Sequence, residues 1–238
     1  MASLDELYRR QAAALEKLER EEIRATIDLF AKTKRGLAGQ LLEYDGEVAL
    51  SKQAAGNAVA DLTAAFRERI QFSISDAAVM GQDHIVALGG IYKGVLTADQ
   101  YMTAVSTTLR GVPEHVIQVA MNRIWSDGLT LSDRIWRMSA YMKEQLENQL
   151  VIGISQGRTI REVAKDVNAV FDQVQDWQAL RLVRTETIGA YREAYVEAGN
   201  QKDYITGYDW VLSNAEKNCD VCAELAAGSP YDKDKVPS

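Results

Sequence analysis

Apolar residues recur at helical spacing along the first part of the chain, and charged residues fill most of the positions between them. Ser3 and Glu6 have the spacing of a helix capping box. The pattern predicts one long amphipathic helix over residues 3–42, roughly 60 Å long at about 1.5 Å per residue. An apolar face of this kind fits a groove in a partner protein. The stripe consists of Leu4, Tyr8, Leu15, Leu18, Ile27, Phe30, Leu37 and Leu41.

The helical pattern continues over most of the remaining chain. Only 3 prolines occur in the whole sequence, and residues that favour helices are abundant. Turns are expected at Asp45–Gly46 and Asp127–Gly128, and the glycines Gly89, Gly90 and Gly94 are expected to loosen the chain. Further helices are predicted over residues 47–80, 98–110, 113–125, 132–157, 159–171 and 176–198, with starts marked by Thr97, Pro113, Ser132 and Thr159.

The pattern changes near the C-terminus. Residues 204–212 alternate between aromatic or β-branched and other side chains, which predicts a strand, and the two cysteines follow it. We therefore predict a mainly α protein with long helices in an elongated N-terminal region. A small α+β C-terminal module would end in a strand and a Cys-x-x-Cys turn. We therefore predict two units, a helical arm over 1–130 and a second domain over 131–238.

Composition excludes several classes of protein. The net charge of −7 argues against a protein that mainly wraps duplex DNA, because such binding neutralises phosphates. Two cysteines in 238 residues indicate no disulfide framework and suit a reducing compartment. The charged N-terminus does not have the pattern of a secretory signal, and no run of eighteen apolar residues predicts a membrane span. We expect synthesis in a cytoplasm and no membrane partner.

Cys219 and Cys222 form a C-x-x-C pair, which is half of the ligand set of a structural zinc site. The two histidines, His84 and His115, lie more than a hundred residues upstream and are interpreted as helix-face residues. Half of a metal site and an unmetallated thiol pair both stay open as interpretations of the residues.

Two helical segments carry other candidate chemistry. Residues 157–171 have the opening pattern of a helix-turn-helix DNA reader, but no glycine turn follows, so an ordinary amphipathic helix is favoured. On the last long helix, Arg184, Thr185 and Glu186 form the densest polar cluster. A buried Arg–Glu pair there would lock the helix to its neighbours. The sequence has no P-loop and none of the common hydrolase or metalloprotease motifs, so no catalytic residue is assigned.

Three motifs in one order resemble the phage Mu F-like minor head proteins, also called phage head morphogenesis proteins. They are GRTIREVA at 157–164, RLVRTE at 181–186, and GYDWVLSNAEKNCDVCAEL at 207–225, which contains Trp210 and both cysteines. Each motif alone is weakly specific, and their order carries the resemblance. The family pattern continues past the cysteine pair to His-Pro-x-Cys-Arg-Cys, whereas this chain stops at Ser238. Either the chain is cut short, or this member lacks the second half. Zinc is expected only if a second ligand pair follows Ser238.

The resemblance implies a structural function in the head of a tailed phage. It assigns residues 131–238 to the head morphogenesis domain, and the arm over 1–130 would dock on the portal protein or the major capsid protein. Such a protein would assist head assembly and DNA packaging or ejection, after synthesis in the cytoplasm of a bacterial host, and is not an enzyme. Packaged DNA is a further candidate partner. The alternative is a DNA-binding module that uses residues 157–171.

Overall fold

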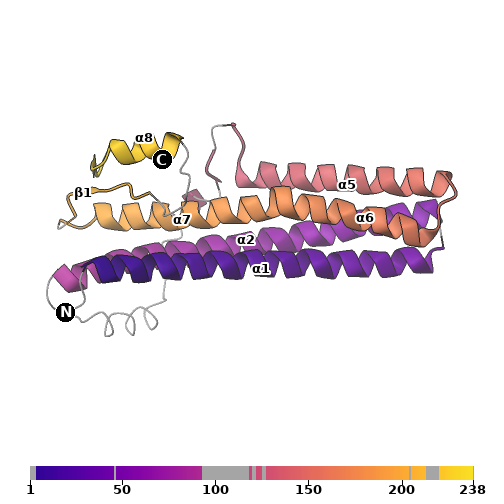
Figure 1. Cartoon of the computed structure of the whole chain (residues 1–238), viewed down its shortest axis with the longest axis horizontal. Helices are drawn as coiled ribbons and strands as arrows, with labels where there is room; N and C mark the ends of the chain where they lie inside the picture. The colour runs from indigo at the N-terminus through magenta and orange to yellow at the C-terminus, as the bar shows by residue number, and fades with distance from the viewer. Residues whose placement is uncertain are drawn as a thin grey trace.

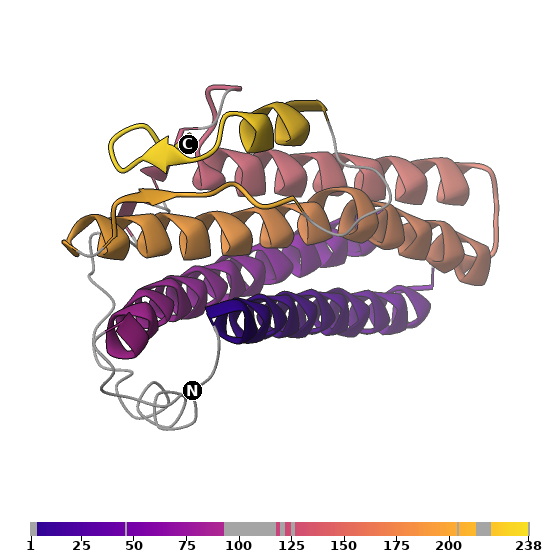
Figure 2. The same cartoon turned by 60° about the vertical axis from the view of Figure 1, so that its left-hand side comes forward.

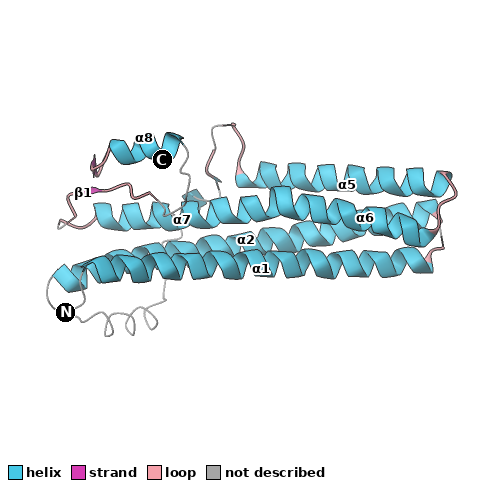
Figure 3. Cartoon of the chain, in the orientation of Figure 1, coloured by secondary structure: helices cyan, strands magenta, loops and turns pink. Residues whose placement is uncertain are grey.

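The computed structural model describes residues 4–45, 47–92, 118–119, 122–124, 127–203, 205–212 and 220–237. Its helices are α1 (Leu4–Glu43), α2 (Val48–Tyr92), α5 (Leu131–Ser155), α6 (Ile160–Val174), the π-helical stretch η1 (Gln175–Ala179), α7 (Leu180–Asn200) and α8 (Asp220–Ala227). Two short strands, β1 (Gly207–Tyr208) and β2 (Tyr231–Asp232), pair antiparallel. The mainly helical fold with a small sheet near the C-terminus confirms the predicted fold class (Figure 3).

The long helices run alternately up and down along the long axis of the molecule (Figure 1). In one half α1, α2, α5 and α6 pack together as four helices. In the other half α5 is absent, α1, α2 and α7 pack as three, and the C-terminal module of β1, α8 and β2 lies along α7 (Figure 2). The main hydrophobic core runs from Leu18 of α1 to Ala190 of α7, so helices from both sides of residue 130 share it.

Helix α1 has the predicted extent, but its apolar stripe does not face a partner. Leu18, Phe30 and Leu37 are buried, and α1 packs against α2, α6 and α7. In this structure most of the stripe is covered by helices of the same chain, so a partner could reach it only if α1 separated from them. Tyr8 and Ile27, which the pattern placed in the stripe, are 45% and 38% exposed.

Helix α2 continues beyond its predicted end, through Gly89 and Gly90 to Tyr92. Packing explains the difference, because Ala87 and Leu88 are buried in a small cluster with Leu7 and Ala198. Such tertiary contacts override the unfavourable helix propensity of glycine. The helices predicted from Thr97 and Pro113, and residues 93–117 in general, lie outside the described residues.

Residues 160–200 form one continuous helical run instead of two helices separated near 172–175. The π-helical η1 joins α6 to α7, and an extra residue in such a turn shifts the helix face. Phe171 and Val174 before it, and Ala179 and Val183 after it, therefore all point into the core.

The helix starts and turns around α5 follow local side-chain chemistry. Gly128 has φ of 75° and Gly157 has φ of 69°, which confirms the predicted breaks at these glycines. Thr159 caps α6 as predicted, in a capping box with Glu162. Helix α5 begins one residue before Ser132, because Thr130 caps it in a second capping box with Asp133.

The expected strand over 204–212 is shorter in the structure, where Gly207 and Tyr208 are the residues of the described part, 205–212, that pair with β2. After them, the Trp210 backbone N–H donates to the Ser229 hydroxyl at 2.6 Å, so a side chain takes the place of a strand partner. None of the helices in the described ranges is long and apolar enough to cross a bilayer.

Helices α2 and α7 approach each other closely at Gly81. A Cβ atom at this position would lie 2.4 Å from the Tyr191 carbonyl oxygen and 2.9 Å from the Tyr195 backbone nitrogen. Since both neighbours are backbone atoms, they cannot move aside without separating the helices. We expect Gly81→Ala to lower the free energy of unfolding by about 1–3 kcal/mol, measured by urea denaturation.

Gly56→Ala is the matched control on the same helix, because nothing lies within 4 Å of a Cβ atom built there. It should raise stability by up to about 1 kcal/mol through helix propensity alone. If the two variants changed the free energy of unfolding in the same direction and by the same amount, the prediction that a Cβ atom at Gly81 separates α2 from α7 would be wrong.

Candidate functional site

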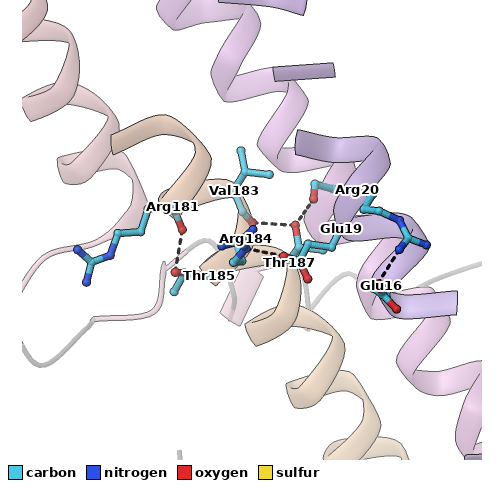
Figure 4. A network of polar contacts seen from close by, with 9 residues as sticks. Glu16, Glu19, Arg20, Arg181, Val183, Arg184, Thr185 and Thr187 are labelled. Carbon is cyan, nitrogen blue, oxygen red and sulfur yellow. Dashed lines mark hydrogen bonds and ion pairs between the residues drawn. The ribbon is translucent and has the colours of Figure 1, made fainter. Parts of the chain in front are cut away.

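Arg184 lies on the side of α7 that faces α1. Its guanidinium Nε donates to a carboxylate oxygen of Glu19 (Figure 4). The Arg184 side chain is 59% exposed and that of Glu19 is 20% exposed. Exposed ion pairs contribute little to stability. The pair therefore positions α7 against α1 without being the buried lock that the sequence suggested.

Thr185 and Glu186 point in different directions on the same helix. The Thr185 hydroxyl donates to the Arg181 carbonyl oxygen at 2.8 Å, near the surface (Figure 4). Glu186 is 1% exposed. The predicted cluster of Arg184, Thr185 and Glu186 therefore divides between two faces of α7, so these residues do not form one site.

Thr187, which follows the cluster, makes the buried contact between α7 and α2. Its hydroxyl donates to the Val183 carbonyl oxygen at 2.8 Å and lies in hydrogen-bond contact with the Ser73 hydroxyl. Both hydroxyls are buried, and buried hydroxyls are costly unless they are hydrogen-bonded. The sequence pattern did not predict this contact, although Thr187 lies at helical spacing from the apolar Val183 and Ala190.

A half-buried ion pair joins α1 to α2 instead, with the Arg69 side chain 37% exposed. Nη2 of Arg69 lies 2.5 Å from a carboxylate oxygen of Glu22, whose side chain is only 4% exposed. Burial raises the pKa of Glu22, and the charge of Arg69 opposes this shift. A signal existed in the sequence, since Glu22 follows Leu18 by four residues and therefore falls on the apolar face.

His84 lies in a second polar contact toward the N-terminal end of α1. It is 5% exposed, its Nδ1 atom hydrogen-bonds with the Tyr191 hydroxyl at 2.8 Å, and Gln11 donates to its backbone carbonyl at 3.1 Å. Desolvation lowers the pKa of His84 to about 4, so the ring is neutral near pH 7. The sequence interpretation of His84 as a helix-face residue agrees with its place in the α2–α7 contact, while His115 lies outside the described residues.

Three tyrosines continue from His84 along α7 to the C-terminal module. The rings of Tyr191 and Tyr195 stack with centroids 5.9 Å apart, and Tyr195 meets Tyr208 edge-on at 6.3 Å. Burial raises the pKa of Tyr191 and Tyr195, and raises the pKa of Tyr208 to about 12. These hydroxyls stay protonated at neutral pH, which makes them hydrogen-bonding groups and poor acids.

The C-terminal module attaches to α7 through side chains of both. The Tyr208 hydroxyl donates to the Val196 carbonyl at 2.9 Å, and Lys233 donates to the Lys202 carbonyl at 2.7 Å. Trp210 lies under the guanidinium of Arg192, which is 5.0 Å from the centre of its ring. Trp210 is thus a structural residue that fastens the module to the bundle.

The predicted half-site for a metal is described only in part. Cys222 lies within α8, half-buried, and not in a turn between strands, whereas Cys219 lies outside the described residues. Among the residues that the structure describes, no group of three or more His, Cys, Asp or Glu side chains could hold a metal ion.

The segment proposed as a DNA reader is an amphipathic helix of the bundle. Val163, Val167 and Phe171 of α6 are buried, and α6 packs against α5 and α1. A helix-turn-helix reader needs a short turn and a separate second helix. The chain instead continues from α6 through η1 into α7, which favours the amphipathic interpretation.

A shallow open groove of about 400 Å³ lies between α2 and α5. It is lined by Ala60, Thr63, Ala64, Arg67, Glu68, Gln71 and Ser139, and a hydrogen bond of 2.8 Å from Thr63 to Ser139 crosses it. The lining contains no cysteine or histidine, and its one serine accepts that hydrogen bond.

Comparisons with protein-family models, curated proteins and solved structures found no match to this chain. The resemblance to the phage head proteins rests on the motifs in residues 157–225 alone. The polar contacts of α7 described above join helices of one bundle to one another and to the C-terminal module.

Because His84 is buried and neutral, we expect the protein to lose stability in mild acid. The unfolded chain takes up a proton near the ordinary His pKa of about 6.5, whereas the folded chain resists protonation down to about 4. The contribution of His84 is therefore fully present above about pH 6.5 and is lost progressively as pH falls toward 4. We expect this loss to reach about 3 kcal/mol, from a shift of roughly 2.5 units at about 1.4 kcal/mol each.

Urea unfolding of the wild type and of His84→Gln at pH 7.5, 6, 5 and 4.5 measures this loss. Gln keeps a polar group near Tyr191 but does not titrate. The free energy of unfolding of the His84→Gln variant should therefore fall less between pH 7 and 4.5 than that of the wild type. Equal pH dependence in the two proteins would contradict the prediction.

Proposed function

We propose that this chain is a minor structural protein of a tailed-phage head, which associates with the portal vertex and assists head assembly and DNA packaging or ejection. The ordered motifs in residues 157–225 carry the proposal. They fall on α6, on α7 and on the C-terminal module, which follow one another along one side of the bundle. Arg184 joins α7 to α1, and Trp210 joins the module to α7.

The proposed function is structural, without catalysis. The polar side chains of the bundle support this proposal, because they join its elements to one another. They include Arg184, Thr187, His84 and Tyr208. An elongated bundle of this kind suits a spacer between two protein surfaces. The portal protein and the major capsid protein are the proposed partners, and packaged DNA is a further candidate.

The proposed localisation follows from the same function. The protein would be synthesised in the cytoplasm of the bacterial host and carried in the virion. A zinc ion would belong to this function only if further ligands join Cys219 and Cys222.

Co-purification with the cognate portal protein tests the proposal. We expect a complex that survives size-exclusion chromatography at physiological salt, with a fixed ratio of the two proteins, and no complex with the portal protein of an unrelated phage. The major capsid protein is tested in the same way. Failure to co-purify with either protein under assembly conditions would contradict the proposal.

The DNA-binding alternative has a separate signature. Retention on duplex DNA that weakens steeply with salt would favour it, because phosphate contacts release counterions. The structural proposal expects weak retention, since the chain carries a net charge of −7.

A further inference from the structure

The two halves of α1 have buried faces of different character. Between Glu6 and Thr26, the buried side chains are Leu7, Gln11, Leu18, Glu22 and Thr26, so three of the five are polar. Between Leu29 and Glu43 they are Phe30, Leu37 and Leu41, which are all apolar and at most 1% exposed. Since apolar burial is the main favourable term in packing, the second half is held more strongly than the first.

The polar contacts of the first half are also incompletely satisfied. Among the described residues, neither Oε2 of Glu22 nor Nε of Arg69 has a hydrogen-bond partner, although both atoms are buried. A buried polar group without a partner opposes folding. The Glu22–Arg69 pair therefore holds α1 in register on α2 but stabilises the closed bundle weakly.

The position of Leu7 adds to this difference. Leu7 packs in a small cluster with Ile85, Leu88 and Ala198, which is separate from the main core. The main core reaches α1 only from Leu18 onward. Between these two points, the buried contact of α1 is the hydrogen bond of Gln11 to the His84 backbone carbonyl.

The second half of α1 is fixed from more sides. It lies in the four-helix half of the bundle, where α6 also covers it (Figure 1). Phe30 meets Phe66 edge-on with ring centroids 6.1 Å apart, and Lys34 pairs with Asp172 of α6 at 2.6 Å. Among the described helices, the first half of α1 lies against α2 and α7, and Asp209 of the C-terminal module is near Tyr8.

We propose that residues 4–26 of α1 form an arm that detaches from α2 and α7 as one unit, while residues 30–43 stay in the bundle. Stability in proteins is not uniform, and contiguous segments with few apolar contacts open below the global unfolding free energy. Opening frees an amphipathic helix for an assembly partner and uncovers Ile85, Leu88 and Ala198. The inference deepens the proposed function, because the arm is the segment that passes from the bundle to the portal protein.

Hydrogen–deuterium exchange of the full chain, followed by mass spectrometry at several low urea concentrations, tests the arm. A single helix detached from its neighbours is only marginally stable in water, so the backbone hydrogen bonds of the released arm open. We therefore expect the amides of residues 8–26 to exchange at least about tenfold faster than those of residues 30–43, and to share one opening rate. Equal protection of the two segments would overturn the proposal. A gradual increase in rate toward the N-terminus would do so too, because it indicates fraying and not release of a unit.

A double substitution tests the cause. Glu22→Leu with Arg69→Met replaces this pair, whose side chains are 4% and 37% exposed, by apolar side chains. Replacing a buried ion pair in this way is often stabilising in other proteins. We expect it to slow exchange in residues 8–26 at least about tenfold and to leave residues 30–43 unchanged. Unchanged or faster exchange in residues 8–26 would overturn the proposal. If the variant does not fold, the comparison of residues 8–26 with residues 30–43 in the wild type decides between the outcomes.

Glu16→Gln with Arg20→Gln is the matched control. It also removes one ion pair of α1, in which the Glu16 side chain is 64% exposed and that of Arg20 is 62% exposed, and it should leave exchange unchanged. The exchange is measured without any partner. A chain whose arm opens but which does not bind the portal protein would contradict the proposed function alone, and a binding chain with a closed arm would contradict this inference alone.

Discussion

The close packing of α2 against α7 is the contact on which the rest of the structure depends. Gly81 allows the two backbones to approach, and the small buried side chains of Ala78 and Ala194 pack together. Helix α2 also contacts α1 and α5, so it joins all parts of the bundle. The C-terminal module, in turn, is attached to α7. Both ends of the chain are therefore positioned relative to this one pair of helices.

Polar residues are distributed unevenly along that frame. Where four helices pack, the buried positions are nearly all apolar, and Phe30, Phe66 and Phe171 fill the interior. Where three helices pack, Glu22, His84 and Thr187 are buried. Hydrogen bonds between helices fix geometry and contribute little net stability. The structure thus combines a strongly held half with a half whose helices are aligned by specific contacts.

This difference between the two halves is the physical basis of the proposal that the first half of α1 leaves α2 and α7 for an assembly partner. A bundle that was uniformly apolar inside would keep α1 closed, and one that was uniformly polar would not fold. The tyrosines along α7 fix the module to the end of the bundle at which α1 is held by mixed contacts. The module and the first half of α1 therefore lie at the same end of the molecule (Figure 2).

The sequence by itself determined the helical class, the extent of α1 and the cap at Thr159, because these depend on local periodicity and on one side chain bonding its own backbone. Only the tertiary structure decided which partner each face meets. Nothing local to α1 distinguishes a stripe that waits for another protein from one that α2, α6 and α7 cover. The continuation of α2 through Gly90, the π-helical join at η1 and the pairing of Arg184 with Glu19 instead of a buried Arg–Glu contact have the same cause. Each depends on residues distant in the chain, whose contacts outweigh the local preference for a break or a pair.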